Sequence, residues 1–90
     1  MKYIIEKNTV DYSISEQEHI IYQENDEKLV VVNCVAACIW RNLKNGKNID
    51  EIVRVIGEEF KENDEAKIKT DVLRLIDQLS ETGLIRKEIE

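Results

Sequence analysis

Proline is absent from this 90-residue chain, glycine occurs three times and histidine once. No Gly/Ser-rich stretch separates two segments, so we expect a single domain over residues 1–90 without internal repeats. No apolar run approaches the roughly 18 residues of a membrane span. The first residues reach Glu6 too early for the apolar core of a signal peptide, so we expect a cytoplasmic protein with no membrane partner.

The chain also has little from which to build an active site. His19 is its one histidine, and no glycine-rich loop, H-E-x-x-H or G-x-S-x-G motif is present. Catalysis would need a nucleophile beside a base, or an acid–base pair in a cleft. We therefore expect a protein that is not an enzyme and has no cofactor.

Two cysteines, Cys34 and Cys38, are four residues apart, which places both thiols on one face of a helix. Two thiols are half of a zinc site, and His19 belongs to another element. A disulfide within one helical turn would be strained. Because free cysteine is among the most buried residue types, we interpret both as small core side chains and expect no metal.

Positive charge is in the minority, with 13 basic against 19 acidic residues and a formal net charge of −6. The acids are spread along the chain and do not form the D-x-[DN]-x-[DN]-G loop that binds calcium. An acidic balance disfavours a partner that is itself a polyanion, so we expect no nucleic-acid partner.

Three segments in the first third of the chain have the composition and alternation of β-strands. They are Thr9–Ile14, His19–Gln23 and Lys28–Val32. Residues 24–27 are polar and turn-prone, which predicts a hairpin between the second and third strands. The third strand is apolar on both faces, so one face would meet the core and the other would need a cover. We expect a small antiparallel sheet.

From Asn33 onward the apolar period changes from 2 to 3.6 residues, which predicts three helices. Asn33 is a suitable N-cap and Gly46 a suitable C′ residue for the first helix. Asn48 and Glu51 have capping-box spacing for the second. The third runs from about Asp64 to Gly83. The predicted fold class is α+β, a three-stranded antiparallel sheet followed by a three-helix bundle of the winged helix-turn-helix kind.

Each predicted helix carries one apolar stripe, which we assign to the core. The stripe residues are Val35, Ala36, Ile39, Trp40 and Leu43, then Ile49, Ile52, Val53, Ile56 and Phe60, then Ile68, Val72, Leu75, Ile76 and Leu79. Beside the third stripe, the flank with Lys69 and Leu73 is semi-apolar, although Leu73 is equally explained by a wide core stripe. An apolar edge strand beside such a flank is what an extended peptide needs for strand addition.

The segment Val32–Trp40, followed by Gly46, resembles the Leu-Asn-x-Thr-Ala-x-x-Ile-Trp…Gly signature of the PqqD-like proteins. These are the leader-peptide recognition domains of ribosomal-peptide modification pathways. The similarity covers roughly residues 29–85. Val32 stands where leucine is usual, and Val35 where a small hydroxyl residue is usual.

The resemblance implies a non-catalytic adaptor. Members of the family bind the leader of a precursor peptide as an extra strand on the third strand, against the third helix. They present it to a modifying enzyme, such as a radical SAM maturase, or to a leader protease. The peptide-binding positions carried over are Lys28, Leu29, Val30, Val31, Val32, Lys69, Leu73 and Ile76. Asn33 and Trp40 match the motif as a helix cap and a core aromatic, and we expect a monomer or weak dimer.

Binding of DNA is the main alternative, because winged helices commonly do so. Residues 64–79, the candidate recognition helix, contain four acidic and three basic side chains. A DNA reader neutralises several phosphates with a basic face, so the charge argues against a DNA-binding regulator. A protein–protein module that uses the same strand edge for a different partner is a third hypothesis.

Overall fold

The computed structural model describes residues 2–6, 8–24 and 27–88. Its strands are β1 (Lys2–Ile5), β2 (Thr9–Ser13), β3 (Glu18–Gln23), β4 (Lys28–Asn33) and β5 (Ile85–Glu88). β2, β3 and β4 form an antiparallel sheet in that order. The β3–β4 hairpin is therefore as predicted, while residues 25–26 of its predicted turn lie outside the described residues.

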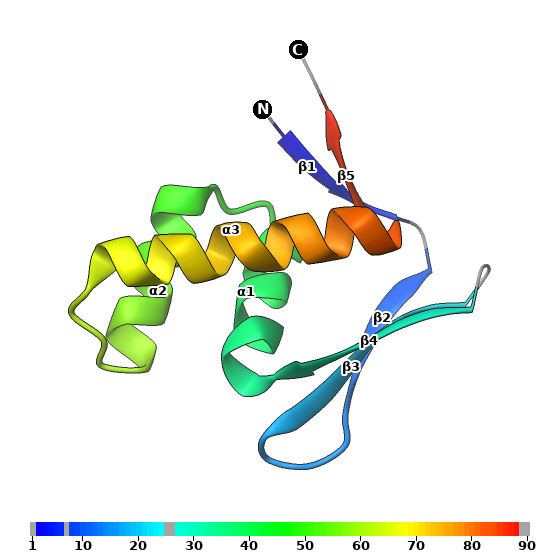
Figure 1. The fold of residues 1–90 in the computed structure, drawn as a ribbon, viewed down its shortest axis with the longest axis horizontal. Coiled ribbons are helices and arrows are strands. Elements are labelled where there is room, and N and C mark those ends of the chain that lie inside the picture. Colours follow the sequence, from blue (N-terminus) through cyan, green and yellow to red (C-terminus); the bar gives the residue numbers. More distant parts are fainter. Residues whose placement is uncertain (1, 7, 25–26, 89–90) are drawn as a thin grey trace.

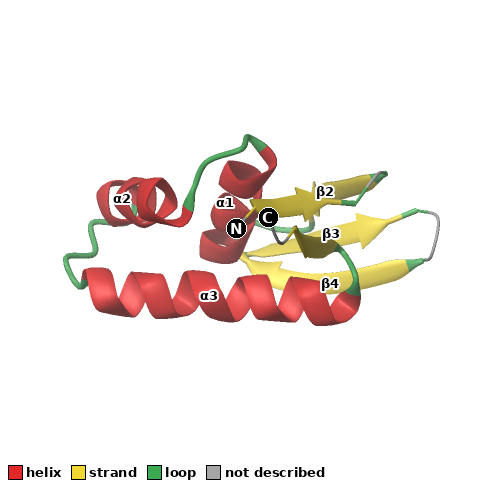
Figure 2. Cartoon of the chain, turned by 90° about the horizontal axis from the view of Figure 1, so that it is seen from above, coloured by secondary structure: helices red, strands yellow, loops and turns green. Residues whose placement is uncertain are grey.

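Three helices follow the sheet, which confirms the predicted α+β fold class (Figure 1). They are α1 (Cys34–Lys44), α2 (Ile49–Glu59) and α3 (Glu65–Thr82). Figure 2 shows α3 running past α2 and α1 and then beside β4. In the described part of the chain, no helix is both long and apolar enough to cross a lipid bilayer.

β3 is the central strand of the three-stranded sheet. Its register with β4 places Ile21 opposite Val30, and both side chains are buried on the inner face, as is Val32. Because side chains alternate along a strand, Leu29 and Val31 lie on the outer face, where each is about half exposed. Within the described residues β4 pairs only with β3, so its other edge is free.

A second sheet joins the two ends of the chain, a pairing that we did not predict from the sequence. β1 is antiparallel to β5, with Ile5 opposite Ile85. Leu84 and Ile85, expected to form a short extended tail, are both buried. In Figure 1 this ribbon and β4 lie on opposite sides of α3.

Helix starts follow the capping pattern of the sequence. Asn33 Oδ1 accepts a hydrogen bond from the backbone N–H of Ala36 at 2.8 Å. Asn48 Oδ1 accepts from the N–H of Glu51 at 2.9 Å, and Glu51 Oε1 accepts from the N–H of Asn48 at 3.4 Å, which completes the predicted capping box. Asp64 caps α3 in the same manner. Each cap stabilises its helix by about 1 kcal/mol.

Glycines with positive φ end α1 and α3. Gly46 has φ 83° and Gly83 has φ 84°, a left-handed conformation in which side-chain-bearing residues are strained. A Cβ atom at Gly83 would also collide with Lys28 Nζ. Gly83 therefore determines the exit of α3, and the Lys28 side chain lies against it.

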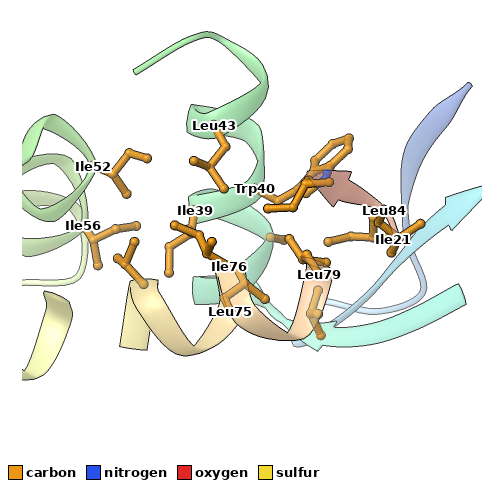
Figure 3. Close-up of a cluster of buried hydrophobic side chains, with 14 of the residues drawn as sticks. Ile21, Ile39, Trp40, Leu43, Ile52, Ile56, Leu75, Ile76, Leu79 and Leu84 are labelled. Atoms are coloured by element: carbon orange, nitrogen blue, oxygen red, sulfur yellow. The ribbon is translucent and has the colours of Figure 1, made fainter. Parts of the chain in front are cut away.

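The core lies between the inner face of the sheet and the helices (Figure 3). Trp40 is completely buried, and all five predicted stripe residues of α3 are buried, which confirms both assignments. On α1 the predicted stripe omitted the buried Ala37, while Val35 and Ala36 are half-buried and pack against the core. Phe60, just after α2, is 38% exposed. The buried side of α1 therefore includes Ala37 and leaves Val35 and Ala36 at its edge.

Candidate functional site

The free edge of β4 is the first component of the candidate site. In an antiparallel strand every second N–H and C=O points away from the partner strand, so about half of the β4 backbone groups face outward from β3. The strand begins where Lys28 lies against Gly83, at the end of α3, and finishes at Asn33 beside the middle of that helix. A free edge of this kind is a template for an additional strand.

A hollow of about 320 Å³ lies where β4 meets α1 and the middle of α3. We call it the Asn33 hollow. Its lining residues are Asn33, Val35, Ala36, Ile39, Asp71, Arg74, Leu75 and Gln78. Its apolar lining residues are Val35, Ala36 and Ile39 of α1 and Leu75 of α3, whereas one flank of α3 supplies polar side chains. The hollow can therefore take an apolar side chain and place polar groups beside it.

Arg74 is the basic residue of this hollow. Its side chain is exposed and makes no ion pair within the described chain. A guanidinium group can hold a carboxylate with two parallel hydrogen bonds. Asp71, one helical turn away, offers the opposite charge on the same rim. The rim can thus recognise an acidic group next to an apolar one.

The five strand positions predicted to pair with a peptide do form the free-edge strand. Val30 and Val32 point into the core, Leu29 and Val31 point to the outer face, and Lys28 is half-buried beside Gly83. None of these side chains projects along the plane of the sheet toward a new strand. What β4 offers at its edge is therefore its backbone.

The three predicted helix positions do not meet at the Asn33 hollow. Lys69 lines a different hollow, of about 800 Å³, together with Tyr3 of β1 and the segment between α1 and α2. Leu73 is 39% exposed, and helical geometry places it on the same flank as Lys69. Ile76 is only 1% exposed and belongs to the core. The flank that reaches the end of β4 is the opposite, polar one.

Sequence reasoning missed Val35, Ala36 and Arg74 as lining residues. One signal was available for the first two, because Asn33 ends β4 and caps α1, so the first turn of α1 has to lie beside the end of the strand. For Arg74 there was no such signal. An amphipathic pattern gives the angle of a residue around the helix axis, but not which flank faces a distant strand.

Both cysteines are half-buried, and Cys38 packs against the core as expected, whereas Cys34 is not among the residues packed there. Cys38 Sγ donates a weak hydrogen bond to Glu59 Oε2 at 3.8 Å. Burial, followed by the charge of Glu59, raises the pKa of the Cys38 thiol, so the unreactive neutral form is favoured. Among the described residues, no group of three His, Cys, Asp or Glu side chains is placed to hold a metal ion.

Comparison with known proteins places this geometry in a family. The chain is similar in fold to TbiB1 in complex with the TbiA(beta) leader peptide, with a TM-score of 0.79 and 23% identity over 100% of both chains. It is also similar to lasso peptide synthetase B1 complexed with the leader peptide, with a TM-score of 0.78 and 15% identity over 97% of this chain and 100% of that one. No curated protein sequence matches the chain. Residues 18–85 match the family model of coenzyme PQQ synthesis protein D, and the chain therefore belongs to the PqqD family.

Proposed function

We propose that the chain is a non-catalytic adaptor that binds the leader region of a ribosomally synthesised precursor peptide. The peptide adds as a strand to the free edge of β4, beside α3. The adaptor then delivers it to a modifying enzyme, such as a radical SAM maturase, or to a leader protease. The observation that carries the proposal is the unpaired edge of β4 running into the Asn33 hollow. Family membership and the two fold neighbours, both solved with leader peptides, support it.

Affinity and specificity come from different parts of this site. Backbone hydrogen bonds along β4 hold any extended peptide that lacks proline at the pairing positions. Specificity comes from the Asn33 hollow, where one apolar side chain of the peptide packs over Val35 and Ala36. Arg74 then selects a peptide with an Asp or Glu close to that apolar anchor. The leader bound by this chain therefore combines an apolar anchor with a nearby acid.

The side chains with catalytic potential are poorly placed for catalysis. His19 is buried on the inner face of the sheet, with 8% of its surface exposed. The raised pKa of Cys38 disfavours the thiolate that a nucleophile requires. Neither residue lines the Asn33 hollow. These placements favour a binding role for the site over a catalytic one.

The charge on α3 does not favour the DNA-binding alternative. α3 would be the recognition helix of a winged helix, and its exposed side chains include Glu65, Asp71 and Asp77. Carboxylates near the phosphate backbone repel it, and a net charge of −6 adds to that repulsion. Arg74 is one cation on this helix, which suits a single peptide carboxylate better than the several phosphates of a DNA backbone.

The test is a titration of the isotopically labelled chain with leader peptides of precursor peptides encoded nearby, followed by NMR. We expect shift changes in β4 and around the Asn33 hollow, with new amide protection on the outward-facing groups of β4. Perturbations confined to α2 or to the β1–β5 ribbon would refute strand addition at this edge.

Backbone N-methylation of the peptide provides a matched control. A methyl group on a peptide nitrogen that faces β4 removes one ladder hydrogen bond and introduces a clash, whereas a methyl group one residue along faces solvent. We expect the two methylated peptides to differ in affinity by at least about tenfold, since each lost bond in a short ladder also disturbs its neighbours. Equal affinities would contradict strand pairing.

A further inference from the structure

The outer face of the three-stranded sheet is apolar and exposed. Two rows of side chains cross all three strands on this face: Val10, Tyr22 and Leu29, and then Tyr12, Ile20 and Val31. Tyr12, Leu29 and Val31 are 53%, 50% and 52% exposed. Ile14, directly after β2, is exposed as well. We call the two rows together with Ile14 the outer apolar face.

An apolar outer face is unusual for such a sheet. An antiparallel sheet with one solvated face normally carries polar side chains there, whereas here aliphatic and aromatic residues occupy consecutive cross-strand positions. The core of the domain uses the inner face, with Ile21, Val30 and Val32. The outer side chains therefore add little to the core, and a contiguous exposed patch of this kind marks a protein interaction site.

The charged residues around this face are acidic. Glu18 lies on the outer side of β3 beyond the second row, and Glu24 and Glu27 lie at the opposite end of the sheet, next to its hairpin turn. Lys28 is the only lysine or arginine in β2, β3 and β4. Lys28 lies two residues before the buried Val30, so its side chain is on the same inner face of β4, where it lies against Gly83 and away from the outer face. The face therefore has an apolar centre with carboxylates at both ends.

We propose that the outer apolar face docks a second protein whose contact surface has an apolar centre and lysine or arginine at its margins. The inference rests on the proposed function, since for a peptide adaptor this partner is the enzyme that acts on the bound peptide. A second copy of the chain fits poorly, because two such faces in contact would bring carboxylates together at the margins. A basic margin on the partner pairs with Glu18 and Glu24 instead.

A bound peptide would enlarge this surface. As a fourth strand on β4, it would place alternate side chains on the outer face next to Leu29 and Val31. Three strands about 4.8 Å apart and about 17–20 Å long cover only part of the roughly 800 Å² per partner that a stable interface buries. The partner would then contact the adaptor and the peptide together, and bind the loaded adaptor more tightly than the empty one.

The test uses the full chain, its leader peptide and the purified maturation enzyme encoded beside it. The double variant Tyr12→Thr/Ile14→Thr removes exposed apolar surface at β2, the edge of the sheet away from β4, and keeps residues that favour strands. Phe60→Thr, which changes an exposed aromatic residue after α2, is the matched control. Calorimetry measures enzyme binding with and without the leader peptide, and peptide binding to the adaptor is measured separately.

We expect the double variant to bind the enzyme at least about tenfold more weakly, the effect of removing an aromatic anchor and its apolar neighbour from an interface. Its peptide affinity and its melting temperature should stay close to those of the wild type, and Phe60→Thr should bind the enzyme normally. Enzyme binding by the wild type should strengthen with peptide and weaken with added salt. Glu18→Gln should reduce that salt dependence.

Equal enzyme binding by the double variant and the wild type, or no enzyme binding by either, would overturn the inference. Dimerisation of the wild type in sedimentation, abolished in the double variant, would assign the face to a second copy and also overturn it. The proposed function fails by a different result, namely no binding of the leader peptide to the wild type. Because peptide binding and enzyme binding are measured separately, the two failures are distinguishable.

Discussion

The two flanks of α3 border different surfaces. From their composition, the semi-apolar flank was expected beside β4, but it is the polar flank that lies there. Lys69 and Leu73 form the semi-apolar flank, and Lys69 lines the hollow beside β1. Asp71, Arg74 and Gln78 form the polar flank, which borders the Asn33 hollow at the end of β4. The apolar contacts of the hollow come mainly from α1, so α3 need only supply its rim. A helix can therefore border a surface hollow with its more polar side.

The largest expected effect is on stability, and it separates the buried stripe of α3 from its semi-apolar flank. Ile76→Ala should lower the free energy of unfolding by about 2–5 kcal/mol, because Ile76 is buried and its removal leaves a cavity. The control Leu73→Ala should cost less than about 1 kcal/mol, since Leu73 is partly exposed. Urea denaturation measures both. If the Ile76→Ala protein were as stable as the wild type, Ile76 would not be a core residue, and its predicted role in lining the peptide groove would stand.

Filling the Asn33 hollow should have the next largest effect. Ala36→Gln places a longer polar side chain where the apolar anchor of the peptide packs, and we expect peptide binding to weaken at least about tenfold, or about 1.4 kcal/mol. Ala66→Gln, at an exposed position on the other flank, should leave affinity unchanged. Calorimetry with the leader peptide measures both. Similar losses in the two variants would mean that the hollow is not the anchor site.

Arg74 and Lys69 allow a direct comparison of the two flanks. Arg74→Ala should weaken peptide binding by about 0.5–1 kcal/mol, the scale of an exposed ion pair, with a smaller loss at high salt. Lys69→Ala should change binding by less than about 0.3 kcal/mol at the same salt concentrations, since no peptide contact is expected there. Fluorescence anisotropy of a labelled leader peptide is sensitive enough for this pair. The reverse order of effects would show that the peptide uses the semi-apolar flank.

Leu73→Glu, on the semi-apolar flank, is also expected to have only a small effect. If Leu73 lies outside the site, the added charge remains in solvent, and both stability and peptide affinity should stay within about 0.5 kcal/mol of the wild type. Thermal melting and peptide titration measure the two quantities. A loss of about 1–3 kcal/mol in affinity at unchanged stability would indicate an apolar peptide anchor packed on Leu73.

The features predictable from the sequence are those set by neighbours in the chain. Asn33, Asn48 and Asp64 each accept a hydrogen bond from the backbone N–H three residues further on, so short-range patterns could locate the three helix starts. The stripe of α3 was predictable for the same reason, since a 3.6-residue period is a local property. Its five buried residues match the pattern without exception.

Features that depend on distant segments were not predictable in this way. The β1–β5 ribbon pairs four-residue strands from the two ends of the chain, and four residues carry too little pattern to identify a partner. The choice of flank on α3 depends on where β4 lies after the chain has passed through α1 and α2. Val35 and Ala36 fell within the apolar period of α1, and that period does not show that they are only half-buried and line the Asn33 hollow.

The position of the β1–β5 ribbon determines where a second protein fused to either end of this domain would start. Both of its strands extend from the side of α3 opposite β4 (Figure 1). A protein fused before β1 or after β5 would therefore start away from the edge of β4 and leave it accessible. The ribbon would separate the fused enzyme from the β4 edge. The length of the linker would then set the effective concentration of a bound peptide at the active site of that enzyme. Either end of the chain is thus a suitable attachment point for an enzyme that needs its substrate kept nearby.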